Sequence, residues 1–448
     1  MRTWTRQVTS AVAASMAVLL VPSVGTAAPP WPVAGAPAFG PEFLWGVAAS
    51  GFQSEGHAPD SNWMRYIADR GLEPYENSID FYDRYASDID LAKSLGVKVF
   101  RIGIEWARLQ PTGPNQWDAD GFAFYDKVVA KIVAARMRPM ITLDHWVYPA
   151  WAFEKGGWDS DSMVSHWLAN MKKVVDRYDG RDPLWVTINE PVAYIMHEVV
   201  KNETNQQVME DRVVEAHNAI YDYIHDKRPT AKVTSNVAYV AGEDEQVNGQ
   251  VVAKIRDRLD YIGLDYYFAR SATPSSVSTP ARAIADSPLS GISQLTVRAE
   301  GIYYALKRYS GLFPGKPLYV VENGMPIEDG GTRLDGYTRS DHLRDTVYWL
   351  QRAKADGVSL MGYNYWSITD NYEWGSYSPR FGLYQVDVVG KPDALERKAT
   401  DAVPTYTTII AEGGVPDGYQ PTREAAPCEA VDSYAGCAGL PSTPPPSS

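Results

Sequence analysis

The strongest constraint on the fold of this chain is an alternation of short apolar runs with helical patterns. Eight runs of strand length lie between residues 43 and 368, and stretches with apolar residues at every third or fourth position fill the gaps between them. The runs are FLWGVAAS (43–50), VKVFRIGI (97–104), RPMITLDHW (138–146), LWVTINE (184–190), AKVTSNVAYV (231–240), LDYIGLDYYF (259–268), PLYVVENG (317–324) and SLMGYNYWSI (359–368). Strands that alternate with helices form a parallel sheet, and eight such units can close into a barrel.

We therefore predict an α/β fold, a (β/α)8 TIM barrel with one catalytic domain over residues 29–420. The helical patterns include residues 80–96 and 339–357, each of which ends at a glycine, and residues 120–136. Glycine commonly follows the last turn of a helix. An open doubly wound sheet is the alternative, but the glycine-rich nucleotide-binding fingerprint often found in that fold is missing after the first run.

The two ends of the chain depart from this pattern. Residues 1–28 carry two arginines, then an apolar run, then small residues, which is typical of a secretory signal peptide. The run is short for a membrane span. We therefore expect cleavage near residues 27–28 and a secreted, extracellular protein with no membrane attachment in its mature form. Residues 421–448 form a Pro- and Ser-rich tail with both cysteines, Cys428 and Cys437, which we expect to pair in an exported protein.

Charge and motif content exclude several classes of partner. The formal net charge is −13, whereas nucleic-acid binding needs a basic surface, so we expect no nucleic-acid partner. The seven histidines show no metal-ligand spacing, and the chain has no P-loop or G-x-G-x-x-G pattern. We therefore predict no metal and no other cofactor.

Polar and aromatic residues gather where the predicted strands end. In a (β/α)8 barrel the carboxyl ends of the strands form the active site. Along the chain these residues are Gln53, Glu55, Arg101, His145, Trp146, Asn189, Glu190, Asp265, Tyr266, Tyr267, Glu322, Asn323, Trp366, Asp370, Glu373 and Trp374. The fifth run offers only Asn236, which we do not rank. Each residue alone has a structural explanation, but their convergence on one rim favours a functional site.

Glu190 and Glu322 are the pair on which the predicted chemistry depends. They end the fourth and seventh runs, which face each other across an eight-stranded barrel. Glycoside hydrolysis requires two carboxyl groups, one ionised and one with a raised pKa that transfers protons. Arg101 and Tyr267 can hold one carboxylate ionised and oriented. Trp366 offers a sugar ring an apolar face.

At these residues the chain resembles glycoside hydrolase family 1, the retaining β-glucosidase family, from about Phe43 to about Asp387. The similar motifs are FLWGVAASGFQSEG, FRIGIEWARLQP, TINEP, YVVENGM and YWSITDNYEWGSYSPRFGLYQVD. The resemblance implies that Glu322 is the nucleophile and Glu190 the acid/base. It implies that the sugar is bound by Gln53, His145, Asn189, Trp366, Glu373 and Trp374. It also implies that Arg101, Tyr267 and Asp265 flank the nucleophile.

The resemblance also bears on the substrate. A carboxylate at Glu373 would repel a phosphorylated sugar, so a plain β-glycoside is expected. Members usually have Asn at the position of Asp265 and Thr at that of Val321. The stretch from Glu190 to Leu264 is shorter than is usual, which favours a more open cleft and a bulky aglycone or a disaccharide glycoside.

The leading prediction is therefore a secreted retaining β-glycosidase that acts by double displacement. A transglycosidase would use the same residues. A catalytically dead carbohydrate-binding barrel is less favoured, because both glutamates are present.

Overall fold

The strands of the sheet close into a barrel. In the computed structural model the parallel strands follow the order β5-β4-β3-β2-β1-β10-β8-β7-β6. They are β1 (Leu44–Ala48), β2 (Val99–Gly103), β3 (Arg138–Asp144), β4 (Leu184–Ile188), β5 (Lys232–Thr234), β6 (Val237–Ala238), β7 (Ile262–Asp265), β8 (Leu318–Asn323) and β10 (Leu360–Trp366). Only Ser235 and Asn236 separate β5 from β6; β5 pairs with β4, and β6 pairs with β7. These two pieces form the fifth barrel strand, which confirms the eight predicted strands and the (β/α)8 fold.

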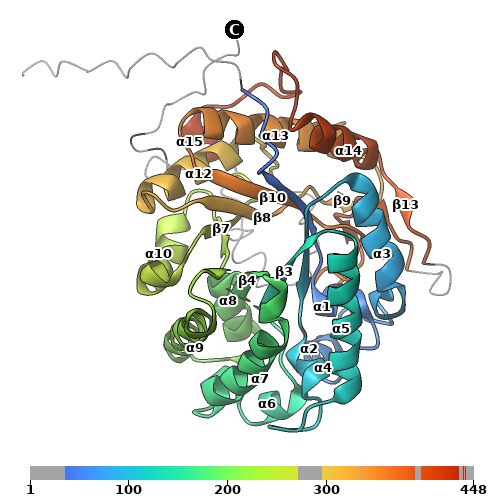
Figure 1. Ribbon diagram of the computed structural model, residues 1–448, viewed down its shortest axis with the longest axis vertical. Coiled ribbons are helices and arrows are strands. Elements are labelled where there is room, and N and C mark those ends of the chain that lie inside the picture. The colour runs from blue at the N-terminus through green and yellow to red at the C-terminus, as the bar shows by residue number, and fades with distance from the viewer. Residues whose placement is uncertain are drawn as a thin grey trace, which may run out of the picture. The chain divides into compact units, whose positions relative to one another are not determined.

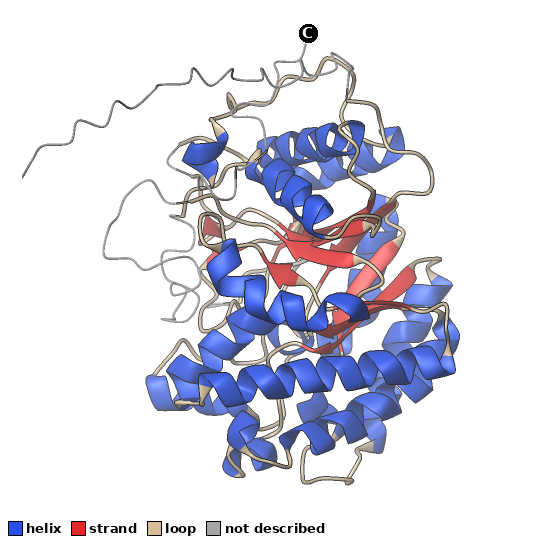
Figure 2. Ribbon diagram, turned by 90° about the vertical axis from the view of Figure 1, so that its left-hand side faces the viewer, coloured by secondary structure: helices blue, strands red, loops and turns tan. Residues whose placement is uncertain are grey.

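Helices surround the strands on the outside, as Figures 1 and 2 show. They are α1 (Gly51–Glu55), α2 (Asn62–Arg70), α3 (Phe81–Leu95), α4 (Trp106–Leu109), α5 (Ala119–Ala134), α6 (Ala150–Glu154), α7 (Met163–Tyr178), α8 (Pro191–Asn202), α9 (Gln206–Lys227), α10 (Asp244–Ile255), α12 (Gly301–Leu312), α13 (Arg339–Ala355), α14 (Ala402–Glu412) and α15 (Cys428–Val431). The three helices predicted from periodicity correspond to α3, α5 and α13. The first of them ends as predicted, because Gly96 takes a left-handed φ of 82° and its N–H bonds to the carbonyl of Lys93.

The structure describes residues 36–270, 295–333, 335–388, 395–432, 437 and 439. The predicted leader (1–28) and the last residues of the tail (440–448) lie outside the described residues. Cys428 and Cys437 form a disulfide, as predicted. Among the described helices, none combines the length and the apolar character needed to cross a membrane. Short two-residue strands β9 (Ile327–Glu328), β11 (Pro379–Arg380), β12 (Tyr384–Gln385) and β13 (Lys398–Ala399) form two small antiparallel pairs.

Apolar side chains fill the interior of the barrel. One buried cluster joins residues from four of the barrel strands and the residue before β7: Val99, Met140, Leu184, Val186, Tyr261, Tyr319 and Val321. Side chains alternate along a strand, so Arg101, two residues after Val99, points into the same interior. The apolar cluster therefore forms a floor beneath the residues at the carboxyl ends of the strands.

Candidate active site

A pocket opens at the carboxyl ends of the barrel strands. It encloses about 740 Å³ of empty space, including its open mouth. Its walls are formed by Gln53, His145, Trp146, Asn189, Glu190, Ala238, Tyr239, Val240, Asp265, Tyr267, Phe268, Glu322, Trp366, Glu373, Trp374 and Phe381. Every residue to which the family resemblance assigns a role lines this pocket except Arg101, which lies buried beneath it and contacts Glu322.

A bulge in β8 aims Glu322 at the pocket. Relative to β7, the step from Leu264 to Asp265 matches two residues of β8, from Val320 to Glu322. An extra residue of this kind re-aims the side chains that follow it, and bulges occur often beside active sites. Val321 packs in the barrel core while Glu322 lines the pocket. An apolar residue at 321 therefore fits its place in the interior.

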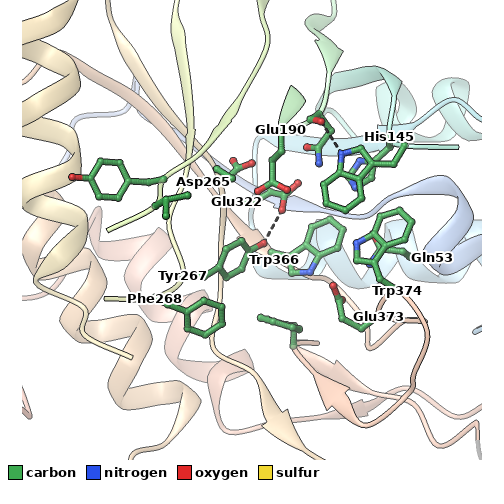
Figure 3. A pocket seen from close by; sticks show the side chains of 16 residues that line it. Gln53, His145, Glu190, Asp265, Tyr267, Phe268, Glu322, Trp366, Glu373 and Trp374 are labelled. Atoms are coloured by element: carbon green, nitrogen blue, oxygen red, sulfur yellow. Dashed lines mark hydrogen bonds between the residues drawn. The ribbon is translucent and has the colours of Figure 1, made fainter. Parts of the chain in front are cut away.

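Two donors hold the Glu322 carboxylate. Arg101 donates from Nη1 to Oε1, and Tyr267 donates from its hydroxyl to Oε2 at 2.7 Å (Figure 3). Burial opposes the charge of Arg101, but the nearby Glu322 and Asp265 carboxylates raise the pKa of Arg101 above its ordinary value. The guanidinium therefore supplies a permanent positive charge beside the Glu322 carboxylate.

Glu190 lies at the junction of β4 and α8. It precedes Pro191 and has a φ of 41°, a left-handed conformation that is uncommon outside glycine and found often at functional sites. Its N–H donates to the carbonyl of Asn236 at 3.1 Å. Burial and the charge of Glu322 raise the pKa of Glu190 to about 8. Glu190 is therefore protonated at neutral pH and can act as an acid.

Asp265 adds a third carboxyl group to the site. Carboxylate oxygens of Glu190, Asp265 and Glu322 all lie within 4.8 Å of one another. Oδ2 of Asp265 accepts from Nδ2 of Asn236, whereas Oδ1 is buried with no hydrogen-bond partner among the described residues. Burial and the charges of Glu322 and Glu190 raise the pKa of Asp265 well above its usual range. The raised pKa favours the protonated form of Asp265, whose hydroxyl can donate a hydrogen bond to an oxygen of Glu190.

The same three carboxyl groups have the spacing of possible metal ligands, as do the partly exposed His57, Asp80 and Asp83. The first group already faces a cation, because Arg101 contacts Glu322. A hydrogen bond with Glu190 accounts for the third carboxyl group, that of Asp265. The geometry gives no reason to place a metal in the first group, and Asp80 of the second group already pairs with Arg84 at 3.2 Å.

The amide of Asn189 is fixed by two donors. Its Oδ1 accepts from Arg101 Nη2 at 2.6 Å and from Asn236 Nδ2 at 2.7 Å. Its NH2 group therefore faces away from both and can donate to a ligand. Asn236, which we left unranked, links Asn189 to Asp265; its only signal in the sequence is a polar side chain at the end of the fifth apolar run.

One side of the pocket combines polar groups with indole rings. Figure 3 shows Gln53, His145, Trp366, Glu373 and Trp374 together there. Burial and the charge of Arg101 lower the pKa of His145 well below its usual range, and burial and Glu322 raise that of Glu373 to about 8. In the part of the chain that the structure describes, Nδ1 of His145 and Oε2 of Glu373 are buried without partners. Such atoms call for a ligand with hydroxyl groups.

The other side of the pocket is mostly apolar. Its residues are Ala238, Tyr239, Val240 and Phe268, and Phe381 packs against both Trp366 and Tyr267. None of these residues was predicted, because nothing in an apolar residue at a strand end separates a pocket wall from the core. In Figure 3, Phe268 and Tyr267 lie on the opposite side of Trp366 from Gln53 and Trp374. The pocket thus has a polar half suited to a sugar and an apolar half suited to a different chemical group.

Some strand-end residues face other partners. Glu55 pairs with Arg108 at 2.8 Å, and Asp370 accepts from two backbone N–H groups, at 2.9 and 3.1 Å. Asn323 donates to the carbonyl of Tyr266, whose hydroxyl donates to the carbonyl of Arg298. These four residues support the rim rather than line the pocket.

Comparisons with known proteins agree with this geometry. The family model of glycosyl hydrolase family 1 matches residues 36–235 and 201–415. The chain is 26% identical over 446 residues to beta-glucosidase A of Thermotoga maritima, covering 84% of this chain and 98% of that protein. It is 27% identical over 384 residues to the galactolipid galactosyltransferase SFR2 of Arabidopsis thaliana, covering 76% of this chain and 59% of that protein. The structure of a beta-glycosidase from Pyrococcus horikoshii superimposes with a TM-score of 0.72 at 26% identity, covering 85% of this chain and 96% of that one.

Proposed function

We propose that this chain, which belongs to glycosyl hydrolase family 1, is a retaining β-glycosidase with Glu322 as nucleophile and Glu190 as acid/base. The observation that carries the proposal is the contrast between these two neighbouring carboxyl groups. Their oxygens approach within 4.8 Å, which suits the separation of about 5–5.5 Å in retaining enzymes rather than the wider gap of inverting ones. Arg101 and Tyr267 bind one carboxylate, and a raised pKa keeps the other protonated.

In the first step a Glu322 oxygen attacks the anomeric carbon of the bound glycoside. The bond from that carbon to the leaving oxygen breaks, and Glu190 transfers its proton to this oxygen. The aglycone leaves as an alcohol, and the sugar remains as an ester of Glu322. Tyr267 and Arg101 orient the attacking carboxylate.

In the second step Glu190, now a carboxylate, takes a proton from water. The resulting hydroxide attacks the anomeric carbon, and the ester bond to Glu322 breaks. Two inversions give net retention. Glu190 ends the cycle protonated, as it began.

The glycone is expected to be an unphosphorylated sugar. Glu373, Gln53, His145 and Trp374 lie together on the polar side, where the amide, imidazole and carboxyl groups can bind hydroxyl groups. On ionisation Glu373 carries a negative charge, which would repel the negative charge of a phosphate group. We place the enzyme outside the cell; the signal-like residues 1–28 and the disulfide support this assignment.

A panel of aryl β-glycosides, with the product anomer followed by NMR, tests the proposal. We expect turnover of plain β-glycosides, the β-anomer as first product, and no turnover of the 6-phosphorylated analogues. The short stretch before Leu264 predicts faster cleavage of bulky aglycones than of a nitrophenyl group. An α-anomer as first product would contradict the retaining mechanism.

Transglycosylation is the second candidate, because one matched relative is a galactolipid galactosyltransferase. The glycosyl ester on Glu322 would then pass to an acceptor hydroxyl, with Glu190 taking the proton of the acceptor instead of that of water. The apolar half of the pocket offers such an acceptor a place. Product analysis with an added alcohol separates the two activities: a transferase forms the new glycoside at low acceptor concentration, whereas a hydrolase releases the free sugar.

The pH dependence of kcat/KM should fall above pH 8. The first step needs protonated Glu190, whose pKa is about 8, so activity is lost as the pH rises through this value. In Asp265→Asn, the pH at which kcat/KM falls should differ from the wild-type value by less than about half a unit, because one neutral hydrogen-bond donor replaces another. If Asp265 were ionised, removing its charge would lower the pKa of Glu190 and shift the limb down by more than about one unit.

A further inference from the structure

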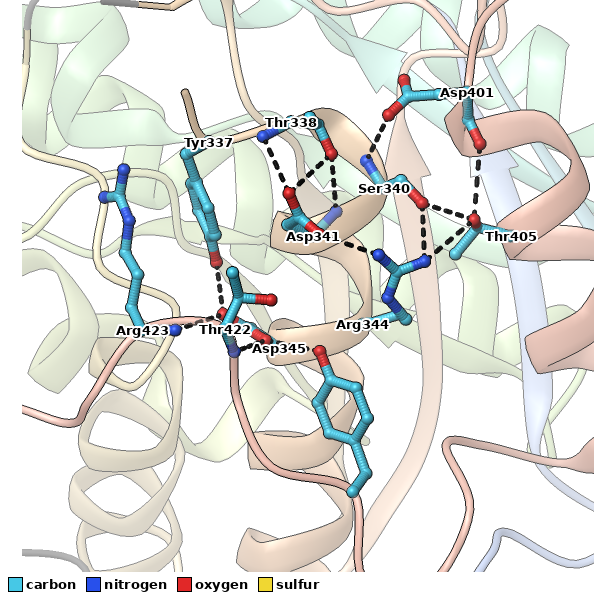
Figure 4. A network of polar contacts seen from close by, with 11 residues as sticks. Tyr337, Thr338, Ser340, Asp341, Arg344, Asp345, Asp401, Thr405, Thr422 and Arg423 are labelled. Atoms are coloured by element: carbon cyan, nitrogen blue, oxygen red, sulfur yellow. Dashed lines mark hydrogen bonds and ion pairs between the residues drawn. The ribbon is translucent and has the colours of Figure 1, made fainter. Parts of the chain in front are cut away.

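The segment that follows α14 is hydrogen-bonded to α13 and to Glu300, which precedes α12. Asp345 of α13 accepts hydrogen bonds from the Tyr419 hydroxyl at 2.7 Å and the Thr422 N–H at 2.8 Å. Figure 4 shows Tyr337 and Arg423 contacting the same carboxylate. Further on, the N–H of Ala426 donates to the Glu300 carboxylate at 3.1 Å. The course of the tail is therefore fixed up to α15.

The tail then reaches the segments that follow β6 and β7. Cys428, the first residue of α15, bonds to Cys437, nine positions further along the chain. The last residue of α15, Val431, accepts a hydrogen bond from the N–H of Arg270 at 2.8 Å. This contact brings Asp432 beside the turn after β6.

Asp432 holds both ends of that turn. Its Oδ2 accepts from the Tyr239 hydroxyl, and its Oδ1 accepts from the Gly242 N–H at 2.6 Å. Gly242 has a φ of 91°, which glycine adopts without a steric cost. Asp432 is only 3% exposed, and a buried carboxylate is costly unless donors satisfy it. The carboxylate thus fixes residues 239–242 in one conformation.

The same turn forms the apolar wall of the pocket. Ala238, Tyr239 and Val240 line it, and the N–H of Tyr239 donates to the Asp265 carbonyl at 2.9 Å. This turn follows β6 beside β7, whereas Gln53, His145 and Trp366 come from the segments at the ends of β1, β3 and β10. The apolar half is therefore left for the group attached to the anomeric oxygen.

We propose that the disulfide-closed tail supports the leaving-group subsite, with Asp432 as a positioning residue that holds the turn after β6, which lines the pocket, in place for an apolar aglycone. The inference rests on the proposed function, because only a glycosidase has a leaving group to bind. It also predicts that the tail acts on the first chemical step alone, since the aglycone has left before the second.

Two substrates with the same sugar test the inference. A 4-nitrophenyl β-glycoside places a ring on the apolar wall, whereas the matching β-glycosyl fluoride has nothing to contact it. Asp432→Ala removes the acceptor of two buried donors, so kcat/KM for the aryl glycoside should fall about tenfold. For the fluoride, kcat/KM should stay within about twofold.

Further variants separate positioning from general damage. Asp432→Asn should recover most of the aryl activity, because its amide oxygen can accept from Gly242 while the Tyr239 hydroxyl accepts from its NH2 group. Tyr239→Phe keeps the Asp432 carboxylate and should show a smaller loss, again on the aryl glycoside and not on the fluoride. This variant tests the inference if Asp432→Ala does not fold. Glu424→Ala, in an exposed part of the same tail, is the matched control and should change neither substrate.

Equal losses on the aryl glycoside and the fluoride in Asp432→Ala and Tyr239→Phe would overturn the inference, since the tail would then only stabilise the fold. Unchanged aryl activity in Tyr239→Phe and Asp432→Ala would overturn it as well. A wild-type enzyme that cleaves neither substrate would instead contradict the proposed function.

Discussion

Replacing Glu322 by glycine is expected to lower the hydrolysis of an aryl β-glycoside by more than about 1,000-fold. The variant lacks the attacking oxygen, so no glycosyl ester can form. Arg101 and Tyr267, which both donate to this carboxylate, lose their acceptor. The binding groups on the polar side remain, so the KM of the residual activity should change far less than kcat. Steady-state kinetics on one aryl glycoside measure both values.

Azide gives this variant a second, independent readout. The small anion fits the space left by the carboxylate and attacks the anomeric carbon from the same side. Glu190 still protonates the leaving oxygen, so an α-glycosyl azide forms by a single inversion. Glu412→Gly, at the exposed end of α14, is the matched control and should retain full activity. Full activity in Glu322→Gly would instead show that another residue is the nucleophile.

The barrel could be predicted from the sequence because its pattern is local. Each strand is a short apolar run buried on both faces, and helices such as α3 carry their own stop signal at Gly96. The division of the fifth strand into β5 and β6 could not be foreseen. It depends on pairing with two different neighbours, β4 and β7. Pairing between distant segments produces no periodic pattern of apolar residues in the sequence.

The candidate site could be predicted where a polar or aromatic side chain follows an apolar run. This signal found Glu190, Glu322 and the residues of the sugar-binding half. It gave no weight to Asn236, whose role appears only once Asn189 and Asp265 are beside it. It also missed the apolar half, because Tyr239 becomes a wall residue through a contact with Asp432, 193 positions away in the sequence.

Replacing Glu190 by alanine should give a loss that depends on the leaving group. Aglycones that depart poorly need the proton of Glu190, so kcat/KM for an alkyl or unactivated aryl glycoside should fall by about 100- to 10,000-fold. A dinitrophenyl glycoside departs without protonation, and its first step should be nearly unaffected. The second step still lacks its base, so the glycosyl ester on Glu322 should accumulate and appear as a burst of dinitrophenol.

The two roles of Glu190 make the pH dependence decisive. The wild-type fall in kcat/KM above pH 8 comes from Glu190 and should vanish in Glu190→Ala for the dinitrophenyl substrate. Added azide should speed release of the sugar as the β-azide, because it needs no base and attacks the ester with a second inversion. Asp265→Asn, which changes the neighbouring carboxyl group, is the matched control and should keep the wild-type limb. Equal losses for activated and unactivated aglycones would contradict the assignment of Glu190 as the acid/base. A residue that only shapes the pocket would not distinguish aglycones by the basicity of the leaving oxygen.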